Sequence, residues 1–169
     1  MKINEISCHL EQLKLPSECN RQPRSLKELK MWQATEFKQF LLYTGPVVLK
    51  GILTRDSYRN FISFSIAIRI TCYKEVERRT ALLPYAKELL EWFVFNAKDF
   101  YGRTFSTYNT HSLIHIHEDV MNHGEDLISM SAFKFENHMQ VLKHFIRNAN
   151  SPLVQVIKRS RVRECKRIN

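Results

Sequence analysis

Apolar positions recur at helical spacing along most of the chain. Between Ser25 and Thr44, large apolar side chains repeat every three or four residues, as the buried stripe of an amphipathic helix does: Leu26, Leu29, Trp32, Phe37, Phe40 and Leu41. Ser25 followed by Glu28 has capping-box spacing and predicts where this helix begins. Gly45–Pro46 is expected to end it, and PVVLKGIL then predicts a short buried helix.

The stretch from Thr54 to Tyr73 fits two patterns. Apolar residues alternate with polar or small ones as in a half-buried strand: Ile62, Phe64, Ile66, Ile68 and Ile70. Tyr58, Phe61, Ile62 and Ile66 instead fit a helix, and the run is long for a strand. The helical neighbours favour a largely buried helix with Thr54 as its N-cap.

Two further helices follow. Thr80–Phe100 has the clearest apolar stripe, with Pro84 expected in its first turn, where the missing N–H costs little. The next helix carries the histidines at 111 and 115. Asn109 or Thr110 is expected to cap it, and Gly124 to end it.

A last long helix is expected over about Ser131–Asn150. Its polar side chains at four- and three-residue intervals predict one stripe: Glu136, Gln140, Lys143 and Arg147. The expected fold is all-α, a single irregular helical domain of about five to seven helices. Residues 1–24 are expected to be an arm or linker, 25–157 the helical domain, and 158–169 a basic tail.

The net charge of the chain indicates which class of partner it is expected to bind. The chain has 26 basic and 17 acidic residues, a net charge of +9, which favours an anionic partner, nucleic acid before membrane. The tail holds Lys158, Arg159, Arg161 and Arg163, which join Lys143 and Arg147 as candidate DNA-binding residues. A nuclear import signal, a solubilising end and a basic but unspecialised domain remain alternatives.

Cysteine usage and hydropathy indicate the cellular compartment in which the protein is expected. The chain has four cysteines and no C-x-x-C pair, which favours reduced thiols in the nucleus or the cytoplasm. Residues 1–20 lack the continuous apolar core of a signal peptide, and no run reaches the roughly 18 apolar residues of a membrane span. We expect no membrane association and a nuclear location, with the cytoplasm as the alternative.

Two groups of residues are candidate metal ligands. His111 and His115 are four apart, so on one helix both imidazoles leave the same face, as two ligands of a zinc ion do. A structural zinc needs four ligands, and ordinary hydrogen-bonded histidines are the alternative. Glu136 is a candidate ligand for a divalent metal beside Lys143 and Arg147, which would meet phosphate; alternatively it is a helix-start residue on a solvated face.

The chain resembles the helical domain that follows the catalytic core motifs in CACTA-type (En/Spm-like) DNA transposases and in transposase-derived proteins. The matching pieces are, in order, PRSLKELKMWQATEFKQFLLYTGPVVLKGIL, YAKELLEWF, YNTHSLIHIHEDV, SAFKFENHMQVLKHFIR and NSPLVQVIKR. The resemblance covers about four-fifths of the chain. More distantly, the layout is similar to the catalytic core of the V(D)J recombinase.

The resemblance implies a piece of an RNase H-like transposase, in which three acids bind two Mg²⁺ or Mn²⁺ ions for strand cleavage and transfer. By position, Glu136 looks like the third acid, and His111 and His115 match a zinc-binding pair. The first two catalytic aspartates and the C-x-x-C have no counterpart here.

Three hypotheses follow from what is present and missing. The first is a catalytically incomplete domain, without nuclease activity of its own, that binds DNA nonspecifically. The second is an enzyme piece whose Glu136 completes a site with a separately encoded transposase core. The third is a protein-interaction scaffold without nucleic-acid binding, which would expose a large apolar patch.

Overall fold

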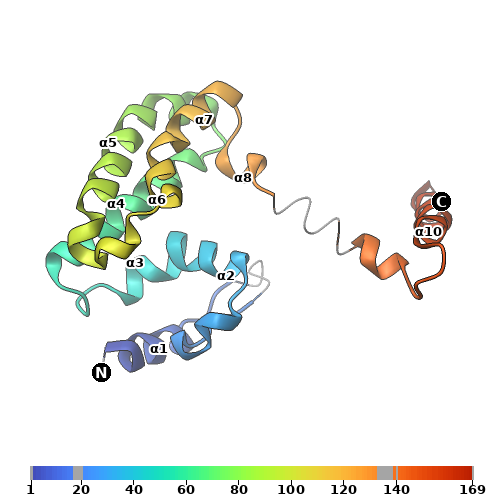
Figure 1. The fold of residues 1–169 in the computed structure, drawn as a ribbon, viewed down its shortest axis with the longest axis horizontal. Helices are drawn as coiled ribbons and strands as arrows, with labels where there is room; N and C mark the ends of the chain where they lie inside the picture. The colour runs from blue at the N-terminus through green and yellow to red at the C-terminus, as the bar shows by residue number, and fades with distance from the viewer. Residues whose placement is uncertain (1, 17–20, 133–138, 140, 169) are drawn as a thin grey trace. The chain divides into compact units, whose positions relative to one another are not determined.

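The described part of the chain is helical throughout. The computed structural model describes residues 2–16, 21–132, 139 and 141–168. These residues form helices and no strand, which confirms the expected all-α class. They include nine α-helices and four short 3-10 or π segments, more than the five to seven helices expected. The chain divides into two compact units, Met1–Leu127 and Ile128–Asn169 (Figure 1).

The first unit is built on a helical hairpin of α4 (Arg55–Thr71) and α5 (Val76–Tyr101), which run side by side (Figure 1). Thr54 caps α4, since its side chain accepts a hydrogen bond from the backbone N–H of Ser57 at 3.3 Å. The rings of Phe64 and Phe93 stack across the hairpin with centroids 4.5 Å apart. The helical interpretation of 54–73 is therefore confirmed.

The main core lies where α4, α5 and the segment before them meet. Its buried residues are Leu42, Ala67, Ile68, Ile70, Ala86 and Leu90. Small side chains on both helices, Ala67 and Ala86 among them, let the two backbones approach closely. The buried Asn60 joins the same interface, because its Nδ2 donates to the carbonyl of Phe93 at 3.4 Å.

Helix α5 begins four residues earlier than expected, at Val76. Pro84 therefore lies inside the helix and not in its first turn, so the expectation for Pro84 is wrong. The earlier start places Arg79 on the buried side with 3% exposure. Its Nη1 donates to the carbonyl of Tyr73 and its Nη2 to that of Gly124, both at 2.6 Å. The guanidinium thus joins the hairpin loop to the end of α7.

Residues 25–48 do not form one continuous helix. A 3-10 helix, η1 (Leu26–Met31), is followed by α2 (Ala34–Gln39), the π-helical η2 (Phe40–Thr44) and α3 (Gly45–Val48). Ser25 does cap η1, accepting from the N–H of Lys27 at 3.2 Å. Glu28 pairs with Arg24 at 3.1 Å, and helical backbone continues through Gly45 and Pro46 instead of ending there.

The N-terminal segment corrects the expected arm or linker over residues 1–24. Helix α1 (Lys2–Gln12) buries Ile6 and Leu10 against Val48 and Leu49 in a second core cluster. The side chain of Ser7 also accepts a hydrogen bond from the N–H of Leu26 at 3.1 Å. A short amphipathic helix packs here because its apolar stripe meets that of α3.

Glu36 of α2 is buried and is held by arginines from the preceding segment. Arg24 donates through Nε to Oε1 at 2.7 Å and through Nη2 to Oε2 at 2.9 Å. Arg21 Nη1 lies 3.6 Å from Oε2, and the N–H of Gln33 donates to Oε2 at 2.9 Å. The hydrogen bond from Arg24 lowers the pKa of Glu36 below its ordinary value, although burial acts in the opposite direction.

Replacing Glu36 by glutamine is expected to destabilise the protein at neutral pH and to matter less in acid. Because the folded-state pKa is lowered, the carboxylate contributes stability above its ordinary pKa of 4.5. That contribution is lost as the pH falls through the lower folded-state value. Urea unfolding of both proteins from neutral to acid pH measures the difference. Glu28→Gln, at a 49% exposed partner of the same Arg24, is the control and should change little. A Glu36→Gln effect that stays constant with pH would contradict this account.

The remainder of the first unit covers α5. After η3 (Arg103–Phe105) come α6 (Tyr108–Ser112), the 3-10 helix η4 (Leu113–His115) and α7 (Ile116–His123). Thr107 caps α6 through the N–H of Thr110 at 3.2 Å, so neither expected residue is the N-cap. Gly124, with φ of 70°, ends α7 as expected.

The second unit contains a helical segment at 141–145 and α10 (Pro152–Ile168). The short α8 (Leu127–Met130) spans the boundary between the units. Two expectations need correction here. The last long helix ends at residue 145 and not at 150, and the basic tail belongs to a 17-residue helix that begins before Lys158. Among the helices that the structure describes, none has the length and apolar character needed to cross a membrane.

Candidate nucleic-acid interface

The positive charge of the chain is concentrated in the second unit. Residues 128–169 hold nine Lys and Arg against two acidic residues, a net charge of +7, while residues 1–127 hold 17 against 15, a net charge of +2. The whole-chain value of +9 therefore describes a nearly neutral unit followed by a strongly basic one. A basic surface of this kind is the electrostatic footprint of a polyanion-binding protein.

A single amide side chain closes the turn that leads into α10. Gln155 Nε2 donates to the carbonyl of Asn150 at 2.6 Å and to that of Asn148 at 3.1 Å. Its Oε1 accepts from the N–H of Arg147 at 3.0 Å. These bonds satisfy backbone groups that would otherwise continue the preceding helix. Ser151, with φ of 48°, then turns the chain into Pro152, the first residue of α10.

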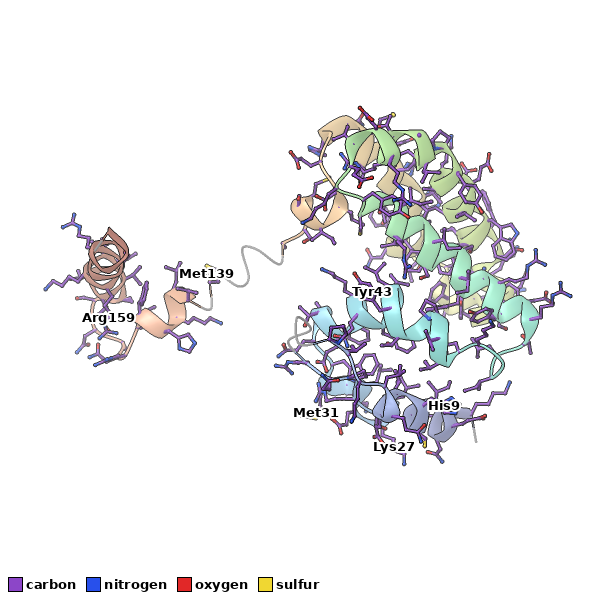
Figure 2. All side chains as sticks on the ribbon, turned by 180° about the vertical axis from the view of Figure 1, so that it is seen from behind. His9, Lys27, Met31, Tyr43, Met139 and Arg159 are labelled. Atoms are coloured by element: carbon purple, nitrogen blue, oxygen red, sulfur yellow. The ribbon has the colours of Figure 1, made fainter. Side chains whose placement is uncertain are left out.

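Arg159 links α10 to the helical segment before it. Its Nη1 donates to the carbonyl of Phe145 at 2.6 Å, at the end of the 141–145 helical segment (Figure 2). A cation at this place also interacts favourably with the negative end of the helix dipole. Arg159 is therefore a positioning residue within the second unit, and its role differs from that expected of a DNA contact.

Four of the expected DNA-binding side chains are exposed and available. Lys143, Arg147, Lys158 and Arg161 are exposed. None makes a side-chain ion pair or hydrogen bond within the described residues. Arg147 lies in the turn after residue 145, so the expected continuous stripe with Lys143 on one helix is wrong. Arg163 lies in α10, but its side chain is outside the described part of the structure.

The histidine pair is close in space, although one helix does not carry both residues. His111 lies in α6 and His115 in η4, with ring centroids 5.8 Å apart. His115 Nδ1 lies 3.2 Å from Glu118 Oε2, and His117 Nδ1 lies 2.7 Å from the carbonyl of Ile114. Within the described residues, no three His, Cys, Asp or Glu side chains are grouped so that they could hold a metal. The zinc pair thus has no further ligand in that part of the chain.

Glu136, the candidate third catalytic acid, lies outside the described residues. Its proposed place beside Lys143 and Arg147 therefore stays a prediction.

The role of Gln155 was missed by sequence reasoning. The signal that could have found it is a glutamine three residues after the Pro152 that starts a helix, preceded by two asparagines.

The resemblance to transposases depends on the order of short motifs in the sequence. Comparison with known proteins adds no relative that would assign these motifs to a family. No protein-family model, no curated protein and no solved structure matches the chain.

Proposed function

We propose that this chain is a transposase-derived helical domain that is catalytically incomplete alone and binds duplex DNA nonspecifically through its second unit. One observation carries the proposal: residues 128–169 hold a net charge of +7, and exposed cations on the 141–145 segment, the turn and α10 have no anionic partner in the described chain. Cations of this kind bind phosphates and release the counterions condensed on DNA.

The same unit offers little for reading bases. Asn and Gln are the side chains that read adenine through two hydrogen bonds. Gln155 and the Oδ1 of Asn148 are already bonded within the turn. The exposed polar side chains described in α10 are the cations Lys158 and Arg161, which suit phosphate, although an arginine can also contact guanine. Phosphate contacts position a protein on DNA and carry no sequence information, so binding is expected to be nonspecific.

The test is fluorescence anisotropy with the full chain and two labelled duplexes of unrelated sequence, each of about two helical turns. Four phosphate contacts predict that log K falls with log salt at a slope of about −3.6 or steeper. The two duplexes should bind within about twofold of each other. Failure to bind at low salt, or a preference of tenfold or more for one sequence, would overturn the proposal.

The chain alone is expected to have no nuclease or transposase activity. Two-metal strand cleavage needs several carboxylates around the metals, and the resemblance supplies only Glu136. Mg²⁺ or Mn²⁺ would bind only in a site completed by a separately encoded transposase core. In that assembly Glu136→Gln is expected to abolish cleavage and leave the fold intact.

A nuclear location is part of the proposal. Six basic residues between Lys158 and Arg167 have the density of a nuclear import signal. A fluorescent fusion of the full chain should accumulate in the nucleus. Charge-neutralising substitutions across this run should redistribute it to the cytoplasm.

A second candidate function is a protein-interaction scaffold. Large apolar side chains of the first unit are exposed to solvent, among them Tyr43 at 56%, Val47 at 61% and Phe95 at 69%. Exposed apolar surface on a nearly neutral unit favours a protein partner over nucleic acid. The two functions are compatible, because they concern different units.

A further inference from the structure

The outer face of the helical hairpin carries a groove. Three apolar side chains from α4 and three from α5 line it: Tyr58, Ile62, Ile66, Tyr85, Leu89 and Trp92. We call this surface the α4–α5 groove. Its volume is about 360 Å³. Ile66, Tyr85 and Trp92 remain 38%, 49% and 39% exposed, so the described residues of the chain leave them partly open to solvent.

The alternating sequence of α4 explains why this face is apolar. Residues two apart on a helix lie about 200° apart around its axis, so alternating apolar residues cover both sides of it. Ile68 and Ile70 are buried in the core, while Ile66 lines the groove on the outer side. A helix that is apolar all round is typically buried all round. The pattern that resembled a strand therefore indicates a second packing surface.

Charged groups flank the groove on opposite sides. Arg59 of α4 lines its edge, and Glu88 of α5 falls between Tyr85 and Trp92 along the helix. Both side chains are exposed, and neither makes an ion pair within the part of the chain that the structure describes. Arg59 thus presents a free guanidinium at the edge of the groove, and the helical spacing of α5 places the free carboxylate of Glu88 beside the lining residues Tyr85 and Trp92.

We infer that the α4–α5 groove binds an amphipathic helix of a partner protein. Its lining on α4 spans Tyr58 to Ile66, about 12 Å at 1.5 Å per residue, and a helix presents side chains i, i+4 and i+7 over about the same length. The partner helix carries a carboxylate toward Arg59 and a cation toward Glu88.

The composition of the groove fits a protein partner. Trp, Tyr and Arg are the residues most enriched among the energetic centres of protein interfaces, and Tyr58, Arg59, Tyr85 and Trp92 are all present. The net charge of only +2 on this unit does not favour nucleic acid. The inference deepens the scaffold function and is independent of DNA binding by the second unit.

The test uses the full chain with Trp32→Phe, which leaves Trp92 as the single tryptophan. The probe is a lactam-bridged helical peptide with Leu at i, i+4 and i+7, Glu along one flank and Lys along the other. Saturable binding with a blue shift of Trp92 emission is expected, because the indole leaves water. A second peptide with the two flanks exchanged should bind at least tenfold more weakly.

Variants separate groove binding from general adhesion. Ile66→Arg is expected to weaken binding at least tenfold, and the milder Ile66→Ser provides the same test if the first variant does not fold. Phe95→Arg, at a 69% exposed residue of α5 outside the groove lining, should bind as the parent does. Arg59→Glu should remove the preference between the two peptides, and Arg59→Glu together with Glu88→Lys should reverse it.

Three results would overturn the inference: no saturable shift with either peptide, equal binding of both peptides, or unchanged binding by a folded Ile66 variant. DNA binding measured on the same variants keeps the two proposals apart. Loss of DNA binding with intact peptide binding would contradict only the proposed DNA function, and the reverse would contradict only the groove.

Discussion

Replacing Arg79 by methionine is expected to lower the free energy of unfolding by about 3 kcal/mol, since hydrogen bonds from a charged donor contribute about 1.5–3 kcal/mol each. The guanidinium is 3% exposed and donates to the carbonyls of Tyr73 and Gly124 at 2.6 Å. Methionine fills similar space but leaves both carbonyl acceptors without this donor. The hairpin loop and the end of α7 would then lose the side chain that joins them.

Thermal and urea unfolding of the full chain measure the effect. Arg78→Met is the matched control, because Arg78 is exposed and packs its guanidinium 4.4 Å from the centre of the Tyr73 ring. An exposed cation–π contact of this kind contributes only about 0.5–1 kcal/mol. Arg79→Lys should fall between wild type and Arg79→Met, since an ammonium lacks the planar fork. Equal stability of the Arg79 and Arg78 variants would contradict the account.

Neutralising Lys158 and Arg161 together, as Lys158→Gln with Arg161→Gln, is expected to weaken DNA binding roughly 50-fold at 0.1 M salt. Each phosphate contact contributes a slope of about 0.9 in log K against log salt. Two lost contacts therefore cost about 1.8 log units across one decade of salt below 1 M. The slope itself should decrease in magnitude by about 2. Both side chains are exposed, so the fold should be unaffected.

The matched control makes the same chemical change in the first unit. Lys98→Gln with Arg103→Gln also removes one lysine and one arginine from exposed positions and lowers the net charge equally. Anisotropy titrations should show affinity within about threefold of wild type, because long-range attraction is screened beyond about 10 Å at 0.1 M salt. Equal losses in the two double variants would mean that net charge alone governs binding.

The apolar spacing in the sequence predicted a helix correctly where a single apolar stripe packs against a single neighbouring element. The stripe of α5 and the Thr54 cap of α4 are of this kind. Local spacing failed where tertiary contacts decide the outcome. Residues 26–48 contain a good amphipathic pattern, yet Gln33 starts a new helix because Glu36 bonds its N–H while also binding Arg24. A pairing twelve residues apart leaves no periodic trace in the sequence.

For the candidate DNA interface, too, the sequence predicted one part, and tertiary contacts decided the rest. Concentration of charge toward the C-terminus was readable from residue counts. The positioning roles of Gln155 and Arg159 were not, because they depend on how the turn between residues 145 and 152 folds. Arg79 was also missed, since an arginine near a helix start is ordinarily exposed. The alternation in α4 is visible in the sequence, but only the structure distinguishes an outer apolar face from a strand.

Amide hydrogen exchange of the full chain with and without a DNA duplex tests the central claim most directly. DNA is expected to slow exchange in residues 141–168 and to leave exchange in α4 and α5 unchanged. Salt high enough to prevent binding should remove the protection, because the contacts are to phosphates. Protection confined to α4 and α5, or bound DNA with no protection in residues 141–168, would contradict DNA binding by the second unit.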